Sequence, residues 1–211
     1  MTQPHEELIA VPRTGTRGGP QTRAKIAEVA SGLFVERGFD AVTVADVAKA
    51  AGVSSVTVFK HFARKEDLFL DRQADALDLL LAAVRDRGPG DDVLVLLRDL
   101  TLELADARHP LSGLADGALP FFQTVAASPA LANRAREIAA GLQQALAEEL
   151  ERPPVFGGDA ALLAAFFIAG YSTVLVDTAR RHLAGEPADT VAEAHRARLD
   201  NLYAVLRDGV T

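Results

Sequence analysis

Hydrophobic positions recur at helical spacing along most of this chain, and no segment shows the strict alternation of a strand. With glycine and proline as boundaries, the pattern predicts helices over about residues 22–37, 43–51, 54–62, 65–87, 91–107, 129–151, 159–183 and 188–207. Residues 109–128 are broken by prolines and glycines, which predicts two short helices with a kink. The predicted fold is therefore all-α, with about nine helices.

The same pattern divides the chain into three segments. Residues 1–20 hold three prolines and three glycines, a composition typical of a disordered arm. Residues 21–68 are predicted to form a small three-helix module, and residues 69–211 a larger helical bundle. Arg13, Arg17 and Arg23 make the arm a candidate for contacts in the minor groove of DNA, and a solvated tail without a role is the alternative.

Two short predicted helices in residues 43–62 are joined by a tight turn. Val44, Val47, Ala48 and Ala51 fall at i, i+3, i+4 and i+7, which gives the first helix one apolar face. Gly52 ends this helix, because only glycine adopts the left-handed C-cap conformation at low cost. The second helix has a polar, cationic and methyl-bearing outer face, which suits the major groove of DNA. That face carries Ser55, Val56, Thr57, Phe59, Lys60 and His61.

This stretch resembles the helix-turn-helix of the TetR family of transcriptional regulators. The resemblance covers residues 22–70, about a third of the chain, and depends on residue types at matching spacing. The matching residues are Thr43, Val44, Val47, Ala48, Ala51, Gly52, Val53, Ser54, Thr57, Phe59, Phe62, Lys65, Glu66 and Leu68. The resemblance implies a homodimeric transcriptional regulator that binds an operator in double-stranded DNA. It also implies that a small effector binds the C-terminal bundle and releases the operator, so that the protein acts as a repressor.

The charge distribution agrees with a DNA-binding N-terminal module. The net charge of the chain is −7, but residues 1–70 carry nine Lys and Arg against eight Asp and Glu. All four lysines, Lys25, Lys49, Lys60 and Lys65, lie in this part. Binding to phosphates requires a local positive face rather than a basic whole protein. The acidic remainder of the chain is expected to face away from the duplex.

The expected phosphate contacts lie at helix ends and on the second short helix. Thr43 and Lys65 stand at predicted helix N-termini, where free backbone N–H groups favour anions. The resemblance implies further phosphate contacts at Phe59 and His61. Phe59 departs from the family's commoner tyrosine, so it cannot donate a hydroxyl hydrogen bond and is left to pack against a sugar or in the core. Arg64 replaces a serine-like cap and is expected to add a phosphate contact.

The expected base contacts come from the outer face of the second short helix. They are Ser55, Val56, Thr57 and Lys60. The methyl groups of Val56 can meet a thymine methyl, and Lys60 can reach guanine O6 and N7 or a phosphate. The alternative for each of them is an exposed helix residue without a role in specificity.

Residues 160–176 are nearly all apolar, which raises the question of a membrane span. This run is shorter than the roughly 20 residues that a bilayer requires, and Asp159 and Asp177 bracket it. We expect no membrane, but a helix buried partly in the protomer core and partly in a homodimer interface, because a helix apolar on most sides needs neighbours on most sides. A purely intramolecular core helix is the alternative.

The resemblance implies dimerisation through the last two long helices. The predicted interface residues are Ala165, Ala169, Gly170, Ser172, Leu199 and Leu202.

The C-terminal bundle is expected to enclose an apolar cavity for a neutral or lipophilic effector. The predicted lining includes aromatic side chains and a few polar ones. These residues are His109, Phe121, Phe122, Gln123, Arg134 and Phe166. Ordinary packing or surface exposure is the alternative for each.

Catalytic and metal-binding patterns are missing from the sequence. The chain has no cysteine, and its five histidines show no metal-ligand pairing. Neither an enzyme nor a cofactor is expected, and the N-terminus lacks the apolar core of a signal peptide, so a cytoplasmic location is expected. The alternative function is a helical small-molecule-binding protein without operator recognition, which the departures at Phe59 and Arg64 allow.

Overall fold

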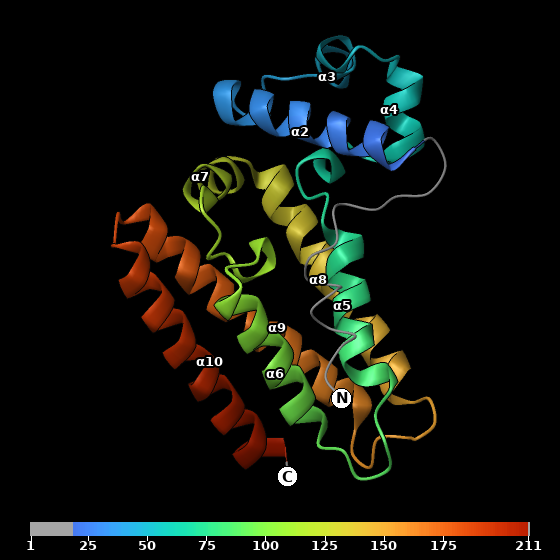
Figure 1. Cartoon of the computed structure of the whole chain (residues 1–211), viewed down its shortest axis with the longest axis vertical. Helices are drawn as coiled ribbons and strands as arrows, with labels where there is room; N and C mark the ends of the chain where they lie inside the picture. Colours follow the sequence, from blue (N-terminus) through green and yellow to red (C-terminus); the bar gives the residue numbers. More distant parts are fainter. Residues whose placement is uncertain (1–18, 211) are drawn as a thin grey trace. The chain divides into compact units, whose positions relative to one another are not determined.

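The computed structural model describes residues 19–210 and is helical throughout that range, with short connections (Figure 1). The predicted arm lies outside the described residues except for its last two positions, and Pro20 already begins the first helix. The nine α-helices of the described residues are α2 (Pro20–Arg37), α3 (Val44–Ala51), α4 (Ser55–His61), α5 (Gln73–Arg85), α6 (Val93–Asp106), α7 (Ala118–Ala127), α8 (Pro129–Leu150), α9 (Ala160–Leu183) and α10 (Ala188–Val210). Two 3-10 helices, η1 (Glu66–Leu68) and η2 (Pro110–Ser112), complete them. The all-α prediction is confirmed.

The long helix predicted over residues 65–87 is wrong in its first part. Residues 66–68 form the 3-10 helix η1, and α5 begins only at Gln73. Leu68 and Phe69 are both buried in the same core, and Arg23 donates to the carbonyl oxygen of Asp71 at 3.2 Å. These long-range contacts keep residues 69–72 from continuing as an α-helix, although the local composition favours a helix.

By internal packing the chain divides into two compact units. The N-terminal unit contains residues 19–75 and Pro120–Arg136, and the C-terminal unit contains Ala76–Leu119 and residues 137–210. The packing division differs from the predicted boundary after residue 68, because residues 69–75 and 120–136 pack with the N-terminal helices.

The N-terminal unit is built around α2, which packs against α3 and η1. Ile26 and Phe34 of α2 are fully buried, as is Leu131 from the first half of α8. The ring of Phe121 stacks on that of Phe69 with centroids 5.0 Å apart. Residues 120–136 therefore belong to the core of this unit, a long-range association that no local pattern indicates.

The C-terminal unit is built around α6, α9 and α10, and α10 packs against both of the others. Between α9 and α10, the hydroxyl of Thr178 lies 2.8 Å from Nδ1 of His195, which is 1% exposed. Burial lowers the pKa of His195 to about 4, because a charged imidazolium would lose its hydration there. The close approach of these two helices is also visible at Gly170, where an added Cβ would lie 2.2 Å from the Cδ1 atom of Leu202.

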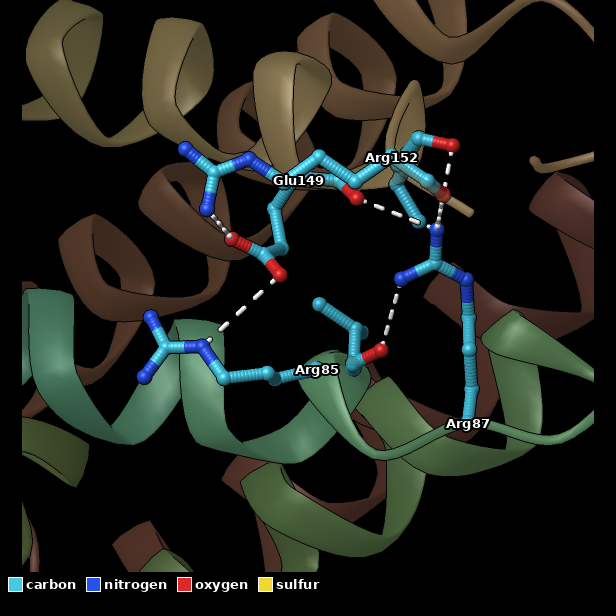
Figure 2. A network of polar contacts seen from close by, with 6 residues as sticks. Arg85, Arg87, Glu149 and Arg152 are labelled. Atoms are coloured by element: carbon cyan, nitrogen blue, oxygen red, sulfur yellow. Dashed lines mark hydrogen bonds and ion pairs between the residues drawn. The ribbon is translucent and has the colours of Figure 1, made fainter. Parts of the chain in front are cut away.

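A buried arginine closes one end of the C-terminal unit (Figure 2). Arg87 is 7% exposed, and its guanidinium donates to the carbonyl oxygens of Val84, Glu149, Leu150 and Arg152 at 2.7–3.1 Å. The last carbonyls of an α-helix have no partner within the helix. Arg87 therefore caps the C-terminus of α8 and joins it to the end of α5.

Helix α9 is the one described helix that is long and apolar enough to cross a membrane by length and composition alone. About a third of its most apolar window is buried within the protomer. The core helices of soluble proteins meet the same criterion, so these properties do not distinguish a membrane from a protein partner.

Candidate nucleic-acid interface

The first helix of the predicted pair begins with a complete capping box. The Thr43 hydroxyl accepts from the backbone N–H of Asp46 at 3.2 Å, and the Asp46 carboxylate accepts from both the N–H and the hydroxyl of Thr43. These bonds, the hydroxyl bond first, hold the pKa of Asp46 below its usual value. The hydroxyl and N–H of Thr43 are thus used within the helix cap, and a carboxylate already lies at the positive helix end where a phosphate was expected.

The turn between the two helices has the geometry that its sequence predicts. Gly52 has φ 72° and ψ 33°, in the left-handed region, and its N–H returns to the last carbonyls of α3. Ser54 caps α4 by accepting from the N–H of Thr57 at 3.1 Å. The hydroxyls of Ser54 and Thr57 are 2.9 Å apart and hydrogen-bonded to each other. The start of α4 is therefore held by local bonds.

Burial divides α4 into an inner and an outer face. Val58 and the following Phe62 are 1% and 2% exposed, so they fix the helix to the core of the N-terminal unit. On the opposite side, Val56 is 66% exposed, Phe59 is 55% exposed and Lys60 is exposed. Phe59 is therefore a surface residue and not part of the core. Ser55 and Thr57 are half-buried at the edges of this face.

Lys65 has an internal role that the sequence pattern did not predict. Its ammonium donates to the carbonyl oxygen of Phe39 at 2.6 Å and lies 4.2 Å from the centre of the Phe39 ring. Arg23, predicted as part of the arm, likewise lies inside the unit, with its guanidinium 4.5 Å from the centre of the Phe62 ring. Cation–π contacts of this kind tie charged groups to aromatic cores.

The remaining predicted phosphate contacts lie around the C-terminal end of α4. Arg64 is exposed, with its Nε 3.9 Å from a carboxylate oxygen of Glu66. His61 is half-buried, and its Nδ1 has no hydrogen-bond partner in the described part of the chain. Their roles toward DNA stay predictions.

The residues predicted to line an effector pocket are divided between the two compact units. Phe121, Phe122, Gln123 and Arg134 belong to the N-terminal unit, where Arg134 forms an ion pair with Asp67 at 2.8 Å. His109 and Phe166 belong to the C-terminal unit.

His109 caps a 3-10 helix, and Phe166 lies on the surface of α9. Nδ1 of the buried His109 accepts from the N–H of Leu111 at the start of η2, and Phe166 is 50% exposed on α9. Two hollows of about 320 Å³ on the C-terminal unit contain none of the six residues. The effector pocket stays a prediction.

The predicted dimer residues fall into two groups. Leu199 is fully buried and Leu202 packs against Gly170, so these three lie between α9 and α10 of one protomer. Leu199 cannot contact a partner, because the packing of α9 against α10 within the chain buries it. Ala169 is exposed, and Ala165 and Ser172 are half-buried.

A more exposed apolar stripe on α9 was missed. It consists of Leu162, Phe166, Ala169, Thr173, Val176 and Leu183, and four of its side chains are 43–50% exposed. From Leu162 to Val176 the spacing alternates between four and three residues, which is the signal that could have found it, and Leu183 follows two turns further on, after Arg180.

Helix α3, the tight Gly52 turn and the short helix α4 with its solvent-exposed outer face have the arrangement of a helix-turn-helix motif. Among the described residues, no group of His, Asp and Glu side chains could hold a metal ion. The family model "Bacterial regulatory proteins, tetR family" matches residues 26–71, so the N-terminal part of the chain is similar to the domain that this model describes.

Similar proteins support the family at two levels. The chain is 41% identical over 64 residues to the HTH-type transcriptional repressor KstR2 of Mycobacterium tuberculosis. That alignment covers 30% of this chain and 32% of KstR2, so the chain spans about a third of the length of this curated relative. A TetR-family regulator from Streptomyces coelicolor is 26% identical, with a TM-score of 0.57 over 89% of this chain and 99% of that one. A SmeT–triclosan complex has the same fold, with 20% identity and a TM-score of 0.60 over 90% and 94% of the two chains.

Proposed function

We propose that this protein is a DNA-binding transcriptional regulator that represses its target genes and is released from a palindromic operator by a small lipophilic effector. The exposed outer face of α4 is the observation that carries the proposal. Val58 and Phe62 anchor the helix from within, the Gly52 turn and the Ser54 cap fix its start, and Val56, Phe59 and Lys60 are left for a ligand in solvent. A short, rigid helix with such a face fits the major groove.

Electrostatics support the same surface. Lys25, Lys49 and Lys60 are all exposed, and they belong to the N-terminal unit. Cations at the surface release counterions from DNA when they approach phosphates, so binding should weaken steeply with salt. Lys65 adds a further positive charge for phosphate binding. Its hydrogen bond to the Phe39 carbonyl also stabilises the N-terminal unit.

The exposed stripe on α9 supports a homodimer. Apolar side chains at alternating spacings of four and three residues form the seam by which helices associate with one another. Each protomer carries one α4, which reads only a few base pairs, and a dimer presents two of them to half-sites about 34–36 Å apart or a multiple of that distance. Dimerisation through α9 would also bury Leu162, Phe166 and Val176, which a soluble protomer leaves half exposed. On this proposal the protein is cytoplasmic, and α9 contacts a second copy of the chain and not a lipid.

A small lipophilic effector is proposed from one structural neighbour and from the core of the C-terminal unit. The SmeT neighbour is described in complex with triclosan, and its 20% identity shows a common fold only. The C-terminal unit has a large apolar core. If its helices separate, a lipophilic molecule can bind between them and contact the apolar side chains. An effector that binds a conformation with lower DNA affinity would shift the population away from the operator.

Selection of bound duplexes from a random pool tests the proposal. We expect enrichment of a near-palindromic sequence, binding that decreases steeply as salt rises, and two protomers per duplex in sedimentation.

The substitution Val176→Asp should yield monomers with much weaker operator binding, whereas Val155→Asp, at a residue that is 67% exposed outside the stripe, should remain dimeric. A protein that binds no duplex at low salt would contradict the proposal.

A further inference from the structure

The outer face of α4 is unusually poor in hydrogen-bonding groups for a helix that discriminates base pairs. Helical spacing places Val56 and Lys60 opposite the buried Val58, with Phe59 beside them. Val56 and Phe59 are three residues apart, so they share one side of the helix. Two of the three most outward side chains therefore carry neither a donor nor an acceptor.

The hydroxyl groups of Ser54 and Thr57, near this face, are already engaged. The Ser54 hydroxyl accepts from the N–H of Thr57, and the hydroxyls of Ser54 and Thr57 bond to each other. Exchanging these bonds for contacts to a base would release the N-cap of α4, which stabilises the start of the helix. Thr57 is thus better placed to hold the helix than to read a base.

We infer, on the basis of the proposed function, that Val56 and Phe59 form an apolar surface that reads the 5-methyl groups of thymines in the major groove. Thymine is the base that offers an apolar group there, and aliphatic and aromatic side chains contact it. Lys60, one turn from Val56, then addresses an adjacent guanine through O6 and N7. Each half-site accordingly contains one or two thymines whose methyl groups lie against Val56 and Phe59.

Replacement of thymine by deoxyuridine tests the inference, because it removes only the methyl group and keeps every hydrogen bond of the base pair. The probe is the duplex selected by the full-length protein from a random pool, with deoxyuridine placed at one thymine position at a time. At one or two positions per half-site we expect the wild-type protein to bind about 3- to 10-fold more weakly, a range around the value of one buried methyl group.

The variant Val56→Ala links the effect to the side chain. Val56 is exposed, so the variant should fold with an unchanged melting temperature. It should bind the thymine duplex more weakly and should lose most of its discrimination between thymine and deoxyuridine at one of those positions. The matched variant Lys60→Ala should keep that discrimination and should instead lose the preference for guanine.

Two results would overturn the inference. One is an unchanged affinity of the wild-type protein when every thymine of the half-site is replaced. The other is full sensitivity to deoxyuridine in both Val56→Ala and Phe59→Ala. Either result leaves the regulator proposal intact if the selected duplex is still bound with sequence preference, whereas failure to select any duplex removes both.

Discussion

The Lys65 ammonium donates a 2.6 Å hydrogen bond to the carbonyl oxygen of Phe39 and lies over the ring of the same residue. The Phe39 ring in turn contacts the buried Phe34 of α2, with centroids 4.9 Å apart. One cation therefore connects the segment after α4 to the loop between α2 and α3. A residue that is expected at a phosphate is also part of the packing of the N-terminal unit.

Lys65→Ala should consequently lower the stability of the protein as well as its DNA affinity. The lost hydrogen bond and cation–π contact together predict a decrease of about 1–2 kcal/mol in the free energy of unfolding. Operator and random duplex should weaken by the same factor, because a phosphate contact carries no sequence information. Urea unfolding and gel-shift titration measure the two effects, and Lys49→Ala, at an exposed lysine on α3, is the control for stability. Unchanged stability of Lys65→Ala would show that the contact with Phe39 contributes nothing.

The elements around α4 could be predicted from sequence because their determinants are local. Helix periodicity, Gly52 and the Ser54 cap all act within a few residues, and α3 and α4 begin and end close to where these residues place them. The exposure of Val56 and Lys60 follows from the same periodicity. Sequence and structure agree here because propensity, capping and pattern favour one conformation.

The contacts that could not be predicted join residues far apart in the chain. Arg134 and Asp67 form an ion pair at 2.8 Å across 67 positions, and Leu131 is buried with the N-terminal helices. Neither residue carries a local signal of its partner, and Arg134 was accordingly predicted as a pocket residue. Lys65 was assigned to DNA for the same reason, since a lysine that follows α4 has the same local pattern whether it contacts a phosphate or Phe39.

His195 should make the stability of the protein depend on pH. Its pKa is about 4 in the folded protein and near 6.5 when unfolded, so the folded state binds fewer protons between these values. The stabilisation is complete above pH 6.5 and is lost as the pH falls toward 4. At pH 5 the expected loss is about 2 kcal/mol.

The variant His195→Leu separates this effect from the titration of carboxylates. It will be less stable at neutral pH, because the Thr178 hydroxyl loses one of its two hydrogen-bond partners and keeps only the Val174 carbonyl. The difference in unfolding free energy between wild type and variant should nevertheless shrink from pH 7.5 to pH 5, as measured by urea unfolding at one protein concentration. Parallel pH dependences of the two proteins would contradict the assignment to His195.

Arg87 and Arg85 provide a matched pair for the cap at the end of α8. Arg87→Ala removes the described donor of the Val84 and Arg152 carbonyls, and one of two donors from each of the Glu149 and Leu150 carbonyls. Loss of these bonds to a buried guanidinium predicts a decrease of about 2–4 kcal/mol in the free energy of unfolding. Arg85 has a 54% exposed side chain, and its Nε lies 3.7 Å from the Glu149 carboxylate, so Arg85→Ala should cost less than about 1 kcal/mol (Figure 2). Chemical unfolding of both variants decides the prediction. Equal losses would mean that charge near Glu149, and not the cap, stabilises this end of the unit.

Gly170 and Gly141 should respond in opposite ways to alanine. Both lie inside helices, where alanine is favoured over glycine by about 1 kcal/mol. Gly141 is exposed on α8 with no atom within 4 Å of an added Cβ, so Gly141→Ala should raise the melting temperature. At Gly170 the added Cβ would meet Leu202 at 2.2 Å, and displacement of that side chain should cancel or reverse the gain. The double variant Gly170→Ala with Leu202→Ala should recover part of it, because truncation of Leu202 makes room for the methyl group. Thermal unfolding of the four proteins tests this coupling, and an equal gain from both single variants would mean that α9 and α10 separate easily at Gly170.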